Sequence, residues 1–227
     1  VRFNSHVTRL QLSDISAEKP FQLDGLVLAD GTEIPCRHLV LAPGHSARDC
    51  FEMLEQIGVQ LQRKPFSVGV RIEHPQHLID AARWGEAAGH PRLGAAEYKL
   101  VHHAENGRCV YSFCMCPGGF VVGATSEEGQ VVTNGMSQHS RNERNANSGL
   151  VVALDADDLA PFERFPGDPL AGIALQRELE ERAFRLGGHS YAAPAQRLED
   201  FLAARPSTRL GAIAASYQPG VHPADLA

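Results

Sequence analysis

Residues His38–Asp49 have the sequence His-Leu-Val-Leu-Ala-Pro-Gly-His-Ser-Ala-Arg-Asp, and this stretch gives the strongest single indication of the fold. Its first five residues, His38–Ala42, form a short apolar run typical of a strand buried on both faces. Pro43–Ser46 is a turn, and behind it apolar residues recur at helical spacing, namely Phe51, Leu54, Ile57 and Leu61. A strand, a glycine turn and a helix in this order predict an α/β unit.

The turn at Gly44 is the first candidate binding element. A buried strand that ends in glycine lets the backbone approach a ligand closely, and the N–H groups of Ser46 and Ala47 can face an anion at the helix start. An ordinary strand-to-helix loop has the same pattern, and spacing alone does not separate the two interpretations.

The residues before this unit predict a small antiparallel sheet. Asp30-Gly31 is a strong hairpin signal between two runs of β-type residues. The expected strands are Val1–Leu12, Phe21–Leu28 and Thr32–Pro35.

The residues after it predict more strands, arranged as an antiparallel meander with flanking helices. Turn residues separate four of the strands, which are Tyr98–His103, Arg108–Cys116, Phe120–Ser126 and Gln130–Met136. Phe66–Ile72 and Leu150–Leu154 are further strands, and His139–Ser148 is expected to be a polar surface loop. Helices are predicted over Pro75–Trp84, Asp168–Leu186 and Ala195–Ala204. The fold class that follows is α+β.

Composition excludes several classes of protein. With 27 acidic against 21 basic residues the formal net charge is −6, which argues against a nucleic-acid-binding domain. No apolar run approaches the roughly 18 residues of a membrane-spanning helix. The five cysteines are an odd set and no signal peptide accompanies them, so we expect reduced thiols and a cytoplasmic location.

Cys114 and Cys116 are the first candidates for chemistry. They lie two apart on a predicted strand, so they are expected to share a face. With His102 and His103 they could bind zinc, they could exchange electrons with a redox cofactor, or they could be small buried side chains under the Gly118-Gly119 turn.

Arg71, Glu73 and His74 form a second candidate group at the end of a predicted strand. In a substrate cleft these side chains could bind an anion and move a proton. Polar residues at a strand end are also commonly just solvated or ion-paired.

Several longer strings resemble those of an uncharacterised bacterial group of FAD-dependent dehydrogenases, of the flavoprotein type with two dinucleotide-binding domains. Besides the strand–turn–helix above, the strings are Val1–Leu10, Pro65–Pro75, Tyr111–Gly119 and Ala193–Arg197. The Cys-Met-Cys-Pro-Gly-Gly part of Tyr111–Gly119 is specific. Pro43 departs from the group's Ala-Thr-Gly pattern because it stands where the group has Thr, and it lacks that residue's hydroxyl and N–H group.

The resemblance implies FAD as cofactor and an unknown small molecule as substrate. The positions that it implies for FAD contacts are Val7, Ala42, Gly44, His45, Ser46, Gly118 and Gly119. From their positions in the sequence we take Arg71, Glu73, His74, Cys114 and Cys116 as the catalytic candidates, and we expect no metal.

The chain contains no Gly-x-Gly-x-x-Gly motif, so the pyrophosphate-binding unit of such flavoproteins is absent from it. We therefore expect the chain to be the central and C-terminal portion of a longer protein, and to bind FAD weakly or not at all by itself. Residues 1–63 would be the remnant of an FAD-binding α/β domain and residues 64–210 an inserted substrate-side domain. Residues 211–227 would return toward the FAD domain.

The leading hypothesis is the substrate-side portion of an FAD-dependent oxidoreductase, which could form a homo-oligomer. The alternative is a non-catalytic α+β module for protein binding or assembly. A thiol- or zinc-dependent protein that uses Cys114 and Cys116 is a third.

Overall fold

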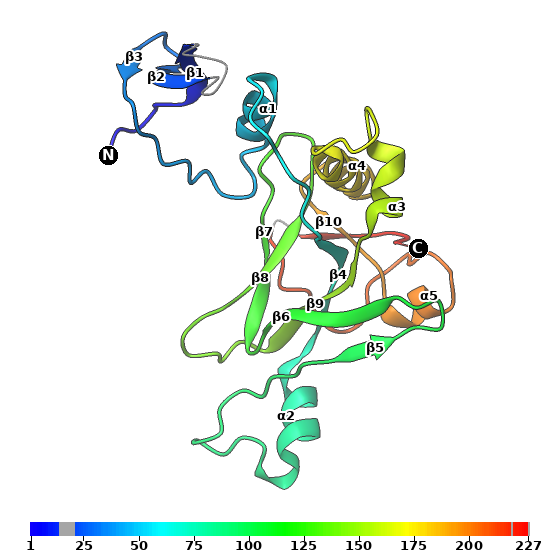
Figure 1. Cartoon of the computed structure of the whole chain (residues 1–227). Coiled ribbons are helices and arrows are strands. Elements are labelled where there is room, and N and C mark those ends of the chain that lie inside the picture. The colour runs from blue at the N-terminus through cyan, green and yellow to red at the C-terminus, as the bar shows by residue number, and fades with distance from the viewer. Residues whose placement is uncertain (14–20, 219, 227) are drawn as a thin grey trace. The chain divides into compact units, whose positions relative to one another are not determined.

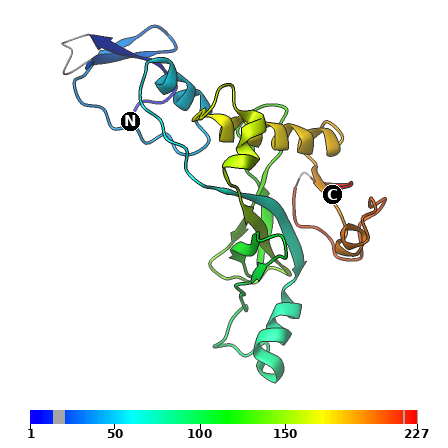
Figure 2. The ribbon, with the colours of Figure 1, turned by 45° about the vertical axis from the view of Figure 1, so that its right-hand side comes forward.

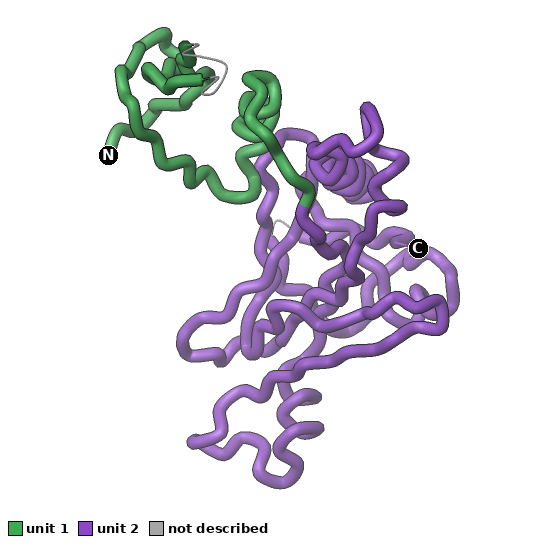
Figure 3. The backbone as a smooth tube through the Cα atoms, viewed as in Figure 1, with its two compact units in different colours: residues 1–63 green, residues 64–227 purple. Residues whose placement is uncertain are grey.

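The structure is a computed structural model that describes residues 1–13, 21–218 and 220–226. It mixes helices with several antiparallel sheets, so the α+β class is confirmed (Figure 1). Two compact units are present, residues 1–63 and residues 64–227 (Figure 3). Each unit is described by itself below.

Unit 1 is a three-stranded antiparallel sheet with one helix. The strands β1 (Val7–Ser13), β2 (Gln22–Leu28) and β3 (Glu33–Pro35) lie in the order β1-β2-β3. The predicted Asp30-Gly31 turn joins β2 to β3. Helix α1 (Arg48–Gln56) follows, and its apolar face packs on the sheet. The core of the unit consists of Leu10, Leu26, Leu28, Met53 and Leu54.

The buried strand predicted over His38–Ala42 does not form. These residues have no regular secondary structure, and the side chains of Val40 and Leu41 are 89% and 44% exposed. A strand buried on both faces needs neighbouring strands for its backbone hydrogen bonds. No strand among the described residues pairs with this segment, so the α/β unit is reduced to a loop followed by α1.

Unit 2 is built on a four-stranded antiparallel sheet. Its strands are β4 (Ser67–Pro75), β9 (Asn145–Ala153), β6 (Cys109–Cys116) and β5 (Val101–His103), in the order β4-β9-β6-β5. The strand order therefore differs from a consecutive meander, because β9 lies between β4 and β6. A separate hairpin consists of β7 (Gly119–Gly123) and β8 (Thr133–Ser137).

The first half of β9 was not expected as a strand. Residues 145–148, predicted as the end of a polar surface loop, pair with β4 and are buried. Their polar side chains are tolerated inside because neighbouring strands supply hydrogen-bond partners for them.

Helices surround these strands. Figures 1 and 2 show α2 beyond the end of β4. The remaining elements are α2 (Gln76–Trp84), η1 (Gly85–Ala87), α3 (Ala156–Leu159), η2 (Ala160–Phe162), α4 (Ala171–Leu186), β10 (Ala193–Ala195), α5 (Leu198–Leu202) and β11 (Val221–Pro223). One core joins β7 to β10 and the chain near its end, through Val121, Val131, Ala193 and Tyr217. A second core lies between α3 and α4, at Leu159, Ala171 and Leu175.

Asp168 fixes the chain in front of α4. Its side chain is 1% exposed, and its carboxylate accepts hydrogen bonds from Arg164 Nε and Nη2 (both 2.7 Å) and from the N–H of Leu170 (2.9 Å). The guanidinium of Arg164 lowers the pKa of this carboxyl far below its usual value, although burial acts in the opposite direction. Asp168 was expected as the helix N-cap, but the helix begins three residues later.

Replacing this carboxylate is expected to destabilise unit 2. Asp168→Asn should lower the free energy of unfolding at pH 7 by about 2 kcal/mol, because a buried acceptor of charged hydrogen bonds is lost. The pKa of Asp168 is lower in the folded state, so its contribution is present above the unfolded pKa of about 4 and lost at lower pH. Urea unfolding of both proteins at pH 7 and below pH 4 measures this difference. The exposed control Asp157→Asn should cost about 0.5 kcal/mol or less, and equal losses in both variants would contradict the assignment.

Candidate functional site

One face of the central sheet of unit 2 gathers polar side chains from several strands. Side chains alternate along a strand, so Arg71 and Glu73 of β4 project from the same face. In the β4–β9 register, Glu73 lies opposite Asn147, which places Asn147 on that face as well. Asn147 is fully buried.

Among the described residues, the hydrogen-bond partners of the Arg71 guanidinium are all neutral oxygen atoms. Its Nη1 donates to Asn147 Oδ1 (2.7 Å) and more weakly to the carbonyl oxygen of Cys114 (3.5 Å), and its Nη2 donates to Asn134 Oδ1 (3.2 Å). These partners come from β9, β6 and β8. The guanidinium is therefore fixed by three strands that lie far apart in the sequence.

Gly135 lets the β7–β8 hairpin approach this guanidinium. A Cβ atom at Gly135 would lie 2.2 Å from Asn147 Oδ1, 2.4 Å from Arg71 Nη1 and 2.9 Å from Cys116 Sγ. These distances are too short for any side chain. Arg71, Asn147 and Cys116 consequently meet at one point, which only a glycine can cover.

Glu73 has a different set of partners. Its carboxylate accepts hydrogen bonds from Asn145 Nδ2 (2.8 Å) and from the backbone N–H of Ser216 (3.1 Å). Asn145 Nδ2 also donates to the carbonyl oxygen of Ala214 (3.1 Å). In this structure Glu73 thus holds residues 214–216 against the sheet.

His74 projects from the opposite face of β4, so the structure divides the predicted Arg71–Glu73–His74 group. Its Nε2 is hydrogen-bonded to the hydroxyl of Tyr98 (3.0 Å). Burial lowers the pKa of His74, against the opposing influence of nearby backbone groups and Glu73. Burial raises the pKa of Tyr98, and Ser148 and Arg71 act in the other direction.

Cys114 and Cys116 do not share a face, contrary to the prediction. The β6–β9 register shifts between Phe113 and Cys116, which is a β-bulge, and Cys114 has a left-handed φ of 46°. The bulge leaves the Cys114 side chain exposed and turns Cys116 into the protein. Among the described residues, no three His, Cys, Asp or Glu side chains gather as metal ligands.

Gly118 lies in the buried turn between β6 and β7, and Gly119 is the first residue of β7. The N–H of Gly118 donates to Gln76 Oε1 (2.6 Å), and a Cβ at Gly118 would lie 1.9 Å from the carbonyl oxygen of Arg141. A Cβ at Gly119 would lie 2.3 Å from the carbonyl oxygen of Met136. Both glycines are therefore required by close backbone packing.

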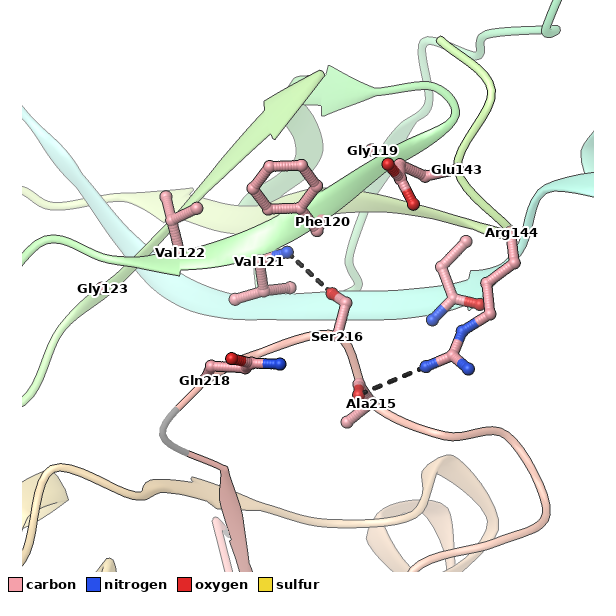
Figure 4. Close-up of a pocket in the computed structure, with 11 residues that line it drawn as sticks. Gly119, Phe120, Val121, Val122, Gly123, Glu143, Arg144, Ala215, Ser216 and Gln218 are labelled. Atoms are coloured by element: carbon pink, nitrogen blue, oxygen red, sulfur yellow. Dashed lines mark hydrogen bonds between the residues drawn. The ribbon is translucent and has the colours of Figure 1, made fainter. Parts of the chain in front are cut away.

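A pocket of about 580 Å³ lies along the edge of β7 that faces away from β8 (Figure 4). Val121 N–H donates to Ser216 Oγ across this edge (2.9 Å). Backbone groups alternate along an antiparallel strand, so those of Gly119 and Gly123 point to the same side as those of Val121. The pocket is lined by Gly119, Phe120, Val121, Val122, Gly123, Glu143, Arg144, Asn145, Ala215, Ser216 and Gln218.

The candidate cofactor positions of unit 1 do not form a comparable site. The Val7 side chain packs against the core of the unit, whereas Ala42, Gly44, His45 and Ser46 are all exposed. Asp49 lies in the first turn of α1, where its carboxylate is hydrogen-bonded to His6 Nε2 (2.8 Å). A negative charge already lies at this helix start.

Sequence reasoning missed most residues that hold the site together. It did not single out Gln76, Tyr98, Asn134, Gly135, Arg144, Asn145, Asn147 or Ser216. One available signal was Asn145-Ala-Asn-Ser148, in which two asparagines alternate with small residues at the period of a strand. This spacing is consistent with two amide side chains directed to one face.

Comparison with known proteins identifies the class. The profile of the family described as "FAD-dependent protein, C-terminal domain-like" matches residues 65–227. A Clostridium beijerinckii protein, described as an uncharacterized protein, is 46% identical over 222 residues. That alignment covers 97% of this chain and 39% of the Clostridium protein. The class is thus that of C-terminal portions of FAD-dependent proteins.

The chain belongs to this FAD-dependent protein family. It spans about two fifths of the length of the relative that it matches. A search of the described residues finds no helix with the length and apolar character needed to cross a membrane.

The glycine at the meeting point gives a direct test of this geometry. Gly135→Ala is expected to displace Arg71 and Asn147 and to lower the free energy of unfolding by about 1–3 kcal/mol, as overpacking does. Chemical unfolding measures the loss of stability. Gly211→Ala is the control, because a Cβ there would have only Arg197 Nε nearby, at 3.8 Å. If Gly135→Ala is as stable as Gly211→Ala, the close contact of position 135 with Arg71 and Asn147 is absent.

Proposed function

We propose that this chain is the substrate-side part of an FAD-dependent oxidoreductase, specifically a dehydrogenase. The observation that carries the proposal is the pocket beside β7, in a chain that belongs to an FAD-dependent family. Its volume of about 580 Å³ falls within the usual range for small-molecule sites. In this proposal unit 2 supplies part of the surroundings of both flavin and substrate.

The residues around the pocket suit a flavin ring. Phe120 and Val122 supply apolar side chains, and the backbone of Gly119 and Gly123 presents N–H and C=O groups at the strand edge. An isoalloxazine ring is apolar at one end and carries alternating C=O and N–H groups at the other. Arg144 adds a positive charge to the lining.

The bound flavin would supply the electron transfer, and the residues of this chain would position the substrate and transfer its protons. Ser216 fixes the β7 edge through Val121, and Glu73 in turn holds Ser216. Cys116 is enclosed next to Arg71, which suits a structural thiol better than a reactive one. His74 is hydrogen-bonded to Tyr98 on the opposite face of β4 and does not line the pocket, so we assign it no step at the flavin.

Unit 1 would contribute to the rest of the FAD-binding domain. Val40 and Leu41 are apolar and exposed, as expected of a strand whose pairing partners are not among the described residues. In this assignment residues 1–63 belong to the FAD-binding domain, 64–210 to the substrate side and 211–227 to the return segment. The thiols are free, which is consistent with a reducing cytoplasmic location.

The experiment compares the complete Clostridium relative with the present 227-residue chain. We expect the relative to purify with bound FAD, identified by its visible absorbance and by mass spectrometry after acid release. The flavin should be bleached by dithionite and regain its colour in air. The present chain should bind FAD at least about 100-fold more weakly, a difference of roughly 2.7 kcal/mol, because its pocket is open and its 38–42 segment is unpaired.

Two results would contradict the proposal. A Clostridium relative that stays colourless and does not take up added FAD would show that FAD is not the cofactor. Equal affinity of the relative and of the 227-residue chain would show that this chain binds FAD without further segments.

A further inference from the structure

The charge of Arg71 is not balanced by any carboxylate in the part of the chain that the structure describes. Its hydrogen-bond partners are two asparagine amide oxygens and one backbone carbonyl oxygen. Arg144 likewise donates to backbone carbonyl oxygens, those of Ala214 and Ala215, but two other arginines of unit 2 differ. Arg108 is paired with Asp158 and Arg177 with Glu127, each at 2.7–2.8 Å. The positive charge of Arg71 therefore remains available to a ligand.

The acidic residue nearest to it in sequence is already engaged. Glu73 lies two residues further along β4 on the same face, roughly 7 Å away at the backbone. Its carboxylate accepts from Asn145 and from the backbone of Ser216. The Glu73 carboxylate is thus engaged elsewhere and does not pair with Arg71.

Hydrogen-bond donors outnumber acceptors around the guanidinium. Arginine has five N–H groups, and the described contacts engage Nη1 and one side of Nη2. Asn134 Oδ1 is shared, because it also accepts from the N–H of Gly135 (2.8 Å). Asn147 Nδ2 is fully buried and has no hydrogen-bond partner among the described residues. The Asn147 Nδ2 group has no accessible surface. It therefore adds to the local positive potential but would not contact a ligand.

Arg71 is half-buried, and the two sides of its guanidinium differ in their surroundings. The Nη1 side faces buried Asn147, whereas the Nη2 side faces Asn134, whose side chain is exposed. Nε and Nη2 form a planar pair of donors that matches the two oxygens of a carboxylate. The contacts of Nη1 with β9 and β6, and of Nη2 with β8, hold this pair in one orientation before any ligand arrives.

We propose that Arg71 is the binding site for the carboxylate of a small carboxylic acid substrate. The assignment of this carboxylate to the substrate rests on the proposed oxidoreductase function, but its binding to Arg71 does not. Arg71 would orient the acid and hold it by a bidentate pair of hydrogen bonds. The planar pair of donors matches the planar carboxylate group.

The test uses the 227-residue chain without flavin. The Arg71 Nε–Hε signal is assigned by comparing the NMR spectra of the wild type and Arg71→Lys. Sodium acetate and disodium succinate are then titrated at constant ionic strength, with chloride as the balancing anion and phosphate as a second probe. We expect a saturable shift of the Arg71 signal with acetate or succinate, and a weaker response to phosphate.

The same titration of variants gives a second measurement, the change in dissociation constant. Arg71→Gln should raise the dissociation constant at least about 10-fold, and Arg71→Lys should fall in between because it keeps the charge but loses the planar pair of donors. Arg185→Gln is the matched control, since Arg185 is exposed and lies near the carboxylates of Glu178 and Glu181. It should bind as the wild type does. Amide spectra of each variant show whether it is folded.

The proposal is overturned if the Arg71 signal of the folded wild type does not respond to either carboxylate. It is also overturned if folded Arg71→Gln binds as well as the wild type, or if phosphate is preferred. Because the wild-type titration needs no variant, an unfolded Arg71→Gln leaves the test intact. If Arg71 binds a carboxylate but the Clostridium relative is colourless, the flavin function is rejected and the carboxylate site at Arg71 stands.

Discussion

The close approach of Gly135 to Arg71 and Asn147 is the contact on which the rest of unit 2 depends. Without a side chain at position 135, the β7–β8 hairpin can lie directly over the polar face of the central sheet. This brings Asn134 to Arg71 and allows Cys116 to close the gap beneath the bulge in β6. The site is therefore a consequence of backbone packing, and its side chains are fixed before any ligand binds.

The second consequence is the position of the pocket. Glu73 and Asn145 hold residues 214–216, and Ser216 in turn contacts the edge of β7 through Val121. A chain of hydrogen bonds thus links the polar face of the sheet to the pocket wall. The candidate flavin pocket and the candidate anion site are separate features that share β4 and β9 as their support.

The sequence predicts the local elements of this fold better than their partners. Helix α2 and the Asp30-Gly31 hairpin are short-range features, set by capping and turn residues, and both form as expected. The prediction that Cys114 and Cys116 share a face is wrong because a bulge adds one residue to β6. The spacing of residues in the sequence cannot reveal such a bulge. Asn145 and Asn147 resemble loop residues until β4 is paired with β9, which brings them to Glu73 and Arg71. The apolar run at Val40 predicts burial, but burial needs neighbouring strands that the described residues do not supply.

The most direct measurement is a structure of the complete Clostridium beijerinckii relative with FAD bound. The account predicts that the isoalloxazine ring lies against the strand equivalent to β7, within contact of the counterparts of Gly119 and Phe120. It also predicts that the counterpart of Arg71 keeps its neutral partners and an open Nε–Nη2 side. A ring bound entirely by other parts of that protein, with the β7 edge facing solvent, would contradict the account.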